Sequence, residues 1–202
     1  MPLLNTYHVL EREEGYYFVS SEFNAVFRLD REREKIQFLE QIPNEMAWER
    51  NLISKIVQYK DKMIFVPLNA KCIWIKNIKS GNWNSIDLRK GETAKLKFFQ
   101  AIQCGHKIYM IGCCYPSIVC LDMDRESVAY FDGIMGRLDA DGDRMEEVYF
   151  RNQYVQIGSY VYMASCKSNS VLKFNMENEE FDFMKVGNSE WRYSGIAWDG
   201  RR

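Results

Sequence analysis

The 202-residue sequence lacks both an excess of charge of one sign and a long apolar run. Lysine and arginine total 27 against 28 aspartate and glutamate, a net charge of −1. A near-neutral chain has no overall field to attract nucleic acid or anionic lipid, so we expect neither partner. No run of about 18 apolar residues occurs, and residues 1–10 lack the basic start and apolar stretch of a signal peptide. We therefore predict a soluble, cytoplasmic protein.

Residues that hold metals and cofactors are also scarce. The six cysteines form no C-x-x-C pair, and only two histidines are present to complete a zinc cluster. We expect reduced, mostly buried thiols. The glycines are scattered, and none stands in a strand, G-x-G-x-x-G, helix context. The sequence therefore predicts no cofactor.

One acidic segment resembles the opening of a calcium loop, in which oxygen ligands alternate along the chain. Its acids are Asp139, Asp141 and Asp143. The match ends there, because the sixth loop position, which should be glycine, is Arg144, and the twelfth, which should be acidic, is Phe150. A solvated acidic turn is favoured, and these three aspartates are weak metal candidates.

A fourfold internal repeat organises the chain. Its copies start 47, 45 and 53 residues apart, at Tyr16, Met63, Ile108 and Val161. In each copy a second apolar segment begins eight residues after the start, and a third begins twelve residues later, after a polar turn. Another alternating segment precedes each start. Each copy is therefore predicted to form four antiparallel strands, one blade of a larger sheet assembly.

The apolar segments are short and rich in β-branched and aromatic residues, which favours strands over helices. A period of about 45 residues with four strands per repeat is typical of β-propellers. We therefore predict an all-β fold, a single β-propeller domain over residues 1–202. Its four-stranded antiparallel blades are expected at 5–43, 52–88, 96–134 and 148–187.

An extra C-terminal strand is predicted at 193–200, which aligns with the first strand of the earlier units. An unpaired strand carrying Ile196 and Trp198 would be a site for pairing with another chain. Three arrangements stay open: the strand closes a four-bladed ring, two chains complete a larger ring, or the chain is part of a longer propeller. A homodimer through terminal strands is accordingly one predicted partner.

The segment Ile108-Tyr109-Met110-Ile111-Gly112 resembles the second strand of a kelch blade where it meets the kelch glycine pair, and Trp83 stands at the place of the late kelch tryptophan. The resemblance spans residues 16–184. The double glycine is not retained in any copy, and the tryptophan is replaced elsewhere by Ile36, Val128 and Phe181. The chain is thus similar to a divergent kelch-like family, which implies a propeller and raises the expectation of protein binding.

One polar position recurs five residues before each repeat start. It holds Gln58, Gln103 and Gln156, with Glu11 in the first blade and Trp198 in the extra strand. If first strands line a central channel, these side chains form part of a ring there, and an amide offers both a donor and an acceptor. We predict that they contact a ligand. The alternative is that the amides satisfy neighbouring backbone groups.

Neither histidine has a serine or cysteine and an acid nearby in a catalytic order. We therefore expect a non-enzymatic scaffold that binds a protein or a small polar ligand through inter-blade loops, above all residues 133–147, and the channel mouth. Two alternatives remain. One is a glycan-acting hydrolase or lyase, which would need two carboxylates roughly 5 to 10 Å apart. The other is an assembly module that completes a ring by inter-chain strand pairing.

Overall fold

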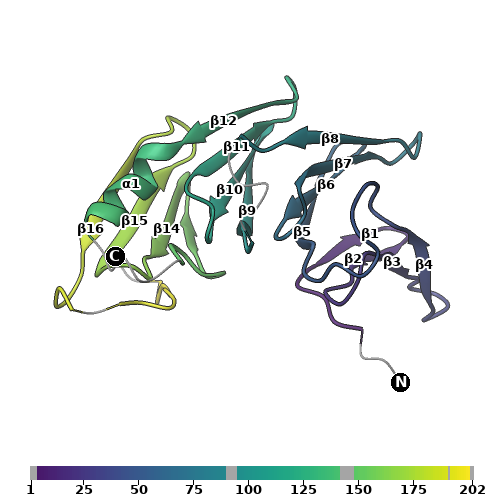
Figure 1. Ribbon diagram of the computed structural model, residues 1–202, viewed down its shortest axis with the longest axis horizontal. Coiled ribbons are helices and arrows are strands. Elements are labelled where there is room, and N and C mark those ends of the chain that lie inside the picture. Colours follow the sequence, from purple (N-terminus) through teal and green to yellow (C-terminus); the bar gives the residue numbers. More distant parts are fainter. Residues whose placement is uncertain (1–3, 90–94, 142–147, 191, 201–202) are drawn as a thin grey trace. The chain divides into compact units, whose positions relative to one another are not determined.

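The structure is a computed structural model that describes residues 4–89, 95–141, 148–190 and 192–200. Its sixteen strands form four antiparallel sheets of four strands, and each sheet uses consecutive strands in chain order (Figure 1). The predicted all-β class and four-stranded sheets are confirmed. The chain divides into two compact units, Met1–Ala101 and Ile102–Arg202.

The first unit holds two sheets, which we call blades 1 and 2. Blade 1 contains β1 (Val9–Arg12), β2 (Gly15–Val19), β3 (Val26–Leu29) and β4 (Ile36–Glu40). Blade 2 contains β5 (Ile53–Tyr59), β6 (Lys62–Pro67), β7 (Cys72–Asn77) and β8 (Trp83–Asp87). The polar turns of the repeat separate these strands, because each turn lets the chain reverse into the next antiparallel strand.

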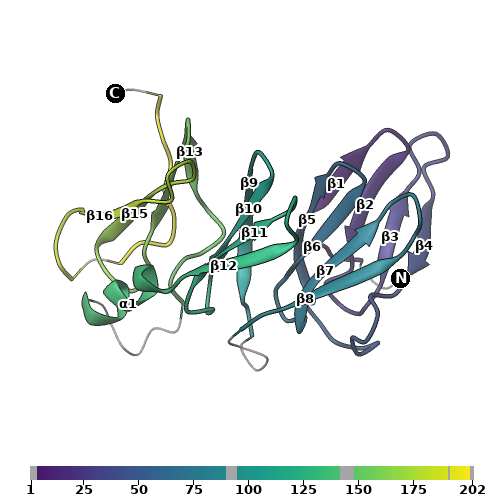
Figure 2. The same ribbon diagram turned by 90° about the horizontal axis from the view of Figure 1, so that it is seen from above.

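Blades 3 and 4 follow, and the boundary between the units falls within β9. Blade 3 contains β9 (Phe98–Cys104), β10 (Lys107–Gly112), β11 (Ile118–Asp122) and β12 (Ser127–Phe131). Blade 4 contains β13 (Val155–Ile157), β14 (Tyr160–Ala164), β15 (Ser170–Asn175) and β16 (Phe181–Lys185). Figure 2 shows these strands from above, with β15 and β16 near the helix that follows β12.

That helix, α1 (Asp132–Asp141), corrects the prediction of a long loop at 133–147. Ile134, Met135 and Leu138 lie on one helical face and are buried in the core of the second unit. This burial stabilises a helix that contains two glycines, Gly133 and Gly136, and has low intrinsic propensity. Residues 142–147 lie outside the described residues. Helix α1 is the one helix in the described part of the chain, and it is unsuited to span a bilayer.

The turn between the third and fourth strands has the same geometry in all four blades. Its first residue accepts, through side-chain Oδ1, the backbone N–H two residues later at 3.0 Å; these residues are Asp30, Asn77, Asp122 and Asn175. The residue four places on has a positive φ in each blade, at Glu34 (50°), Gly81 (75°), Glu126 (50°) and Glu179 (61°). The residue with positive φ therefore occupies the same place in all four turns. It carries a glutamate side chain in blades 1, 3 and 4, and no side chain in blade 2.

Alternate residues of a strand face opposite sides of its sheet, and this decides how blades pack. Each inter-blade core is built from four positions of the repeat. One blade contributes the residues one and three places after its repeat start. The next blade contributes its start residue and the residue two places later. Between blades 1 and 2 these are Tyr17, Val19, Met63 and Phe65. Between blades 3 and 4 they are Tyr109, Ile111, Val161 and Met163. We call this pattern the inter-blade register.

The extra strand predicted at 193–200 is wrong, because the structure has no strand there. Tyr193 instead donates its backbone N–H to the Ser165 carbonyl oxygen at 3.2 Å. Its hydroxyl donates to the Val186 carbonyl oxygen at 2.5 Å. The first strand of a blade obtains its ladder from the second strand, as β1 does from β2. In the described part of the chain residues 193–200 are paired with no second strand, and alternation alone does not form a strand.

Candidate functional site

The three recurrent glutamines bind their own hairpins. In each, Nε2 donates to the backbone carbonyl oxygen two residues later at 3.2 Å; the pairs are Gln58 with Lys60, Gln103 with Gly105 and Gln156 with Gly158. The bond closes the turn between the first and second strands, which accounts for the recurrence of glutamine at this position. It is the backbone contact that we weighed as the alternative. Ligand contact by these amides stays a prediction.

The other two members of the predicted ring have different surroundings. Glu11 on β1 forms an ion pair with Arg31, whose guanidinium group lies over the Tyr16 ring, 4.7 Å from its centroid. Trp198 is exposed on the segment that forms no strand. It therefore does not share the first-strand position of the glutamines.

Asp139 belongs to an ionic contact. Its Oδ1 lies 2.6 Å from Nζ of Lys167, and its Oδ2 accepts the Tyr149 hydroxyl at 2.9 Å. The helical backbone of α1 replaces the predicted acidic turn. The side chain of Asp141 and the whole of Asp143 lie outside the described residues. Among the residues that the structure describes, no three His, Cys, Asp or Glu side chains gather in a way that could hold a metal ion.

A pocket of about 280 Å³ lies between blades 1 and 2. Its walls are mostly apolar, and three charged side chains, Arg12, Glu40 and Lys76, border it. The apolar lining residues are Tyr17, Val26, Leu39, Met63, Phe65 and Ile78. Three of them, Tyr17, Met63 and Phe65, follow the inter-blade register, so the pocket occupies the contact between the two sheets. Apolar walls with a few placed polar groups are typical of small-ligand sites.

Glu40 and Lys76 close one side of the pocket. They form an ion pair, and Trp83 donates Nε1–H to the second carboxylate oxygen of Glu40 at 2.8 Å. Nζ of Lys76 lies 5.3 Å from the centroid of the Trp83 ring. Burial lowers the pKa of Lys76, because removal from water disfavours its charged form. Both oxygens of Glu40 are thus engaged, which fixes that carboxylate in place.

Arg12 and Tyr17 meet on the opposite side. Nη2 of Arg12 lies 3.0 Å from Oε1 of Glu14, and the Tyr17 hydroxyl donates to the same oxygen at 3.0 Å. Burial, together with the neighbouring Glu14, raises the pKa of Tyr17, so its hydroxyl stays protonated and donates. A guanidinium group carries five N–H donors. The pocket lining therefore presents two cations, Arg12 and Lys76, and one carboxylate, Glu40.

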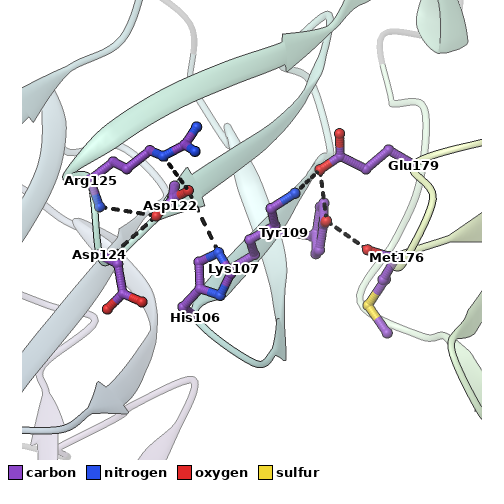
Figure 3. A network of polar contacts seen from close by, with 8 residues as sticks. All are labelled: His106, Lys107, Tyr109, Asp122, Asp124, Arg125, Met176 and Glu179. Carbon is purple, nitrogen blue, oxygen red and sulfur yellow. Dashed lines mark hydrogen bonds and ion pairs between the residues drawn. The ribbon is translucent and has the colours of Figure 1, made fainter.

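The second unit has a closed contact at the equivalent place (Figure 3). Tyr109, at the repeat position of Tyr17, is fully buried. Its hydroxyl donates to the Met176 carbonyl oxygen at 2.8 Å and to Oε1 of Glu179 at 3.0 Å. Nζ of Lys107 lies 2.6 Å from the same Glu179 oxygen, a bond that raises the pKa of Lys107. Burial raises the pKa of Tyr109. Blade 4 thus supplies both acceptors.

One turn residue accounts for the different partners of the two tyrosine hydroxyls. The residue at the place of Glu179 in blade 2 is Gly81, which has no carboxylate. Tyr17 therefore finds no glutamate in the turn of the next blade, and its hydroxyl bonds to Glu14 of its own blade. The contact between blades 1 and 2 retains a pocket at this position.

No family model matches the sequence, and no curated protein matches it. Solved structures are similar. Streptogramin B lyase aligns with a TM-score of 0.61 at 13% identity, over 92% of this chain and 56% of its own. The extracellular domain of the one component system BT4673 from B. thetaiotaomicron gives 0.66 at 10% identity, over 96% of this chain and 25% of its own.

A third similar structure is PorZ, a surface component of the type-IX secretion system of Porphyromonas gingivalis, with a TM-score of 0.57 at 9% identity over 91% of this chain and 23% of its own. The chain spans about half the length of the lyase and about a quarter of the other two. At such identities the likeness shows the fold alone. The chain has four four-stranded antiparallel sheets that match part of a β-propeller.

Proposed function

We propose that the chain is a non-enzymatic, cytoplasmic β-propeller scaffold of kelch-like kinship that binds a small polar ligand in the pocket between blades 1 and 2. The observation that carries this proposal is the pocket itself. It has apolar walls and two bordering cations at a register position that is sealed by side chains in the second unit. Its volume of about 280 Å³ suits a small molecule or a single side chain of a partner.

The charges favour a ligand that bears a carboxylate. Arg12 and Lys76 outnumber Glu40 in the lining, and Lys76 and Trp83 already engage both oxygens of Glu40. A carboxylate on the ligand would accept hydrogen bonds from Arg12, since charge-assisted bonds of this kind are short and strong. The apolar walls would cover an aromatic or branched aliphatic body.

The lining supports binding better than hydrolysis. Among the described residues that line the pocket there is no His, Cys, Ser or Thr, and Glu40 is the one carboxylate. A glycosidase uses two carboxyl groups roughly 5 to 10 Å apart. The hydrolase or lyase alternative would therefore need a site elsewhere in the molecule.

A screen of small carboxylic acids with aromatic or branched aliphatic bodies, followed by ligand-observed NMR, tests the proposal. Arg12→Gln should weaken binding of the best acid about tenfold, the effect of losing one charge-assisted hydrogen bond. Arg31→Gln is a matched control. Like Arg12, Arg31 is in blade 1, pairs with a glutamate and lies over a tyrosine ring, but it does not line the pocket.

The expected result is weaker binding in Arg12→Gln and unchanged binding in Arg31→Gln. If both variants bind the acid as the unmodified chain does, the pocket is not the site. If no acid in the screen binds the unmodified chain at about 1 mM, which corresponds to a very weak complex, the proposed ligand class is wrong.

A further inference from the structure

One face of blade 1 is apolar and partly exposed, although Phe18 within it is buried. It consists of two rows of directly paired residues on the side opposite to the core shared with blade 2. We call it the open face, and its residues are Val9, Phe18, Phe27 and Phe38 in one row and Glu11, Tyr16, Leu29 and Ile36 in the other. Val9 is 44% exposed, Ile36 56% and Phe38 54%.

The phenylalanines of the open face form a ladder across the sheet. Phe18 and Phe27 stack with ring centroids 5.6 Å apart, and Phe27 meets Phe38 edge to face at 5.9 Å. Seven of the eight open-face residues are apolar or aromatic. A contiguous apolar surface of this kind indicates an interface, because packing a partner on it would remove apolar area from water.

The inter-blade register indicates which kind of surface would pack on the open face. The equivalent positions in blades 2 and 4 are packed against the preceding blade or, in blade 4, also against helix α1. In blade 2 they include Met63, Phe65, Trp74 and Trp83, and in blade 4 they include Val161, Met163, Leu172, Phe174, Phe181 and Phe183. The open face thus has the composition of a surface that receives another blade.

Blade 4 has the complementary kind of face uncovered in part. Tyr162 occupies the repeat position of Tyr17 and Tyr109, which both face a following blade. Lys173 is its direct cross-strand neighbour, with Nζ 4.4 Å from the centroid of the Tyr160 ring. Met184 is exposed and lies on β16, two strands away from Tyr162 on β14. This face of blade 4 would pack on the repeat-start residues of a further blade.

The polar groups match as well. Tyr109 and Lys107 bond to Glu179 in the turn of blade 4, and the equivalent residue in the turn of blade 1 is Glu34. Glu34 has the same left-handed backbone as Glu179, with φ of 50° against 61°, and it is exposed. Tyr162 supplies the hydroxyl at the place of Tyr109. Tyr160 stands at the place of Lys107, so the cation that would meet Glu34 comes instead from Lys173, which is paired with Tyr162 and Asp182.

We propose that blade 4 of one copy packs on the open face of blade 1 of a second copy, with Tyr162 and Lys173 meeting Glu34. A second copy is the partner because the chain itself carries complementary groups for this contact, the exposed Glu34 carboxylate on blade 1 and the Tyr162 hydroxyl and Lys173 cation on blade 4. Two such contacts, one in each direction, would close a dimer. The contact is between sheet faces, and not between the terminal strands that the sequence predicted.

Sedimentation equilibrium with charge-reversal variants tests this interface. The unmodified chain should form a dimer. Glu34→Lys and Lys173→Glu should each weaken the dimer about tenfold or more, and the double variant should recover to within about threefold, because the ion pair is restored with reversed sign. Glu32→Lys is the control, since it changes an exposed carboxylate of the same turn. It should leave the dimer unchanged.

Phe38→Asp tests the apolar part of the same interface. The side chain is more than half exposed in the single chain, so circular dichroism should show an unchanged fold while the dimer is lost. A folded Phe38→Asp variant that still dimerises would show that the open face is not the interface. A monomeric unmodified chain at every concentration, or a double charge variant no better than the worse single one, would also overturn the proposal.

Discussion

The contacts between blades 1 and 2 and between blades 3 and 4 follow one register and differ at one turn. In the second unit, the Tyr109 hydroxyl bonds to the Met176 carbonyl oxygen and Glu179 of the next blade. In the first unit, the Tyr17 hydroxyl bonds to Glu14 of its own blade, and a pocket remains. A glycine or a glutamate at one turn position therefore decides whether the tyrosine hydroxyl bonds to the next blade or to its own.

The two contacts differ also in what surrounds them. Helix α1 adds Ile134, Met135 and Leu138 to the core of the second unit, and the described residues of the first unit form no helix. Arg137 of α1 lies over the rings of Phe181 and Phe183 of blade 4, 5.8 and 5.5 Å from their centroids. The helix therefore covers fourth-strand residues whose equivalents in blade 1, Ile36 and Phe38, are more exposed.

Truncation of the helix core should have the largest effect on this comparison. Leu138→Ala should lower the free energy of unfolding of the second unit by about 2–5 kcal/mol, because it leaves a cavity among buried side chains. Native-state hydrogen exchange should show lost protection in β10 and β14 with little change in β2 and β6. A loss below about 1 kcal/mol would mean that α1 does not belong to the core.

Removal of the two equivalent tyrosine hydroxyls should have a smaller and unequal effect. Tyr109→Phe leaves the buried carbonyl oxygen of Met176 without this donor, which should cost about 1–3 kcal/mol. Tyr17→Phe releases a partly exposed carboxylate that Arg12 still binds, so the cost should stay below about 1 kcal/mol. Urea unfolding of the two variants measures the difference. Equal costs would show that the two contacts are equivalent in energy.

Gly81→Glu should make the first contact resemble the second. Gly81 has a φ of 75°, which costs a residue with a side chain about 1 kcal/mol, but glutamate already adopts this backbone at the three equivalent turns. A Cβ at Gly81 would have no atom within 4 Å. The introduced carboxylate should accept the Tyr17 hydroxyl and weaken acid binding in the pocket. Unchanged binding in the NMR titration would separate the pocket from this turn.

Alkaline pH should affect the two units alike, and this is the smallest expected effect. Burial raises the pKa of Cys72 in the first unit and of Cys120 in the second to about 11. The folded chain holds these protons more tightly than the unfolded chain, whose thiols titrate near about 8.5. Their contribution is complete below that pH and is lost as pH rises towards 11.

Urea unfolding at pH 8 and pH 10.5 measures this loss. Cys72→Ala should flatten the decline for the first unit, while Cys104→Ala, which changes a half-buried cysteine in a different strand, should retain it. A chain whose stability does not change over this range would contradict the raised thiol pKa values.

The strands could be predicted because their signal is local. Four identical offsets of eight residues mark the second and third strands of each blade, and alternation marks their faces. Residues 193–200 carry the same alternation, but a strand also needs a ladder partner, which local pattern cannot supply. Helix α1 was missed because Gly133 and Gly136 indicate a loop, and the helix depends on the burial of Leu138 by distant strands.

The candidate site was harder to predict. The recurrence of Gln58, Gln103 and Gln156 was found, but recurrence does not tell a ligand contact from a turn contact within the hairpin. A second recurrence lay in the same alignment: tyrosine at 17, 109 and 162, and glutamate at 34, 126 and 179. The pattern breaks at Gly81, and what that break means depends on which blades face each other.

The most direct measurement is a titration of the best-binding carboxylic acid into the chain with ¹³C-labelled methionine methyl groups. Met63 lines the pocket, and Met163 lies in the sealed contact of the second unit. A difference between the two contacts predicts saturable shifts of the Met63 methyl signal, with the Met163 signal unchanged. Shifts of equal size at both methionines, or none at Met63 up to saturation, would contradict it.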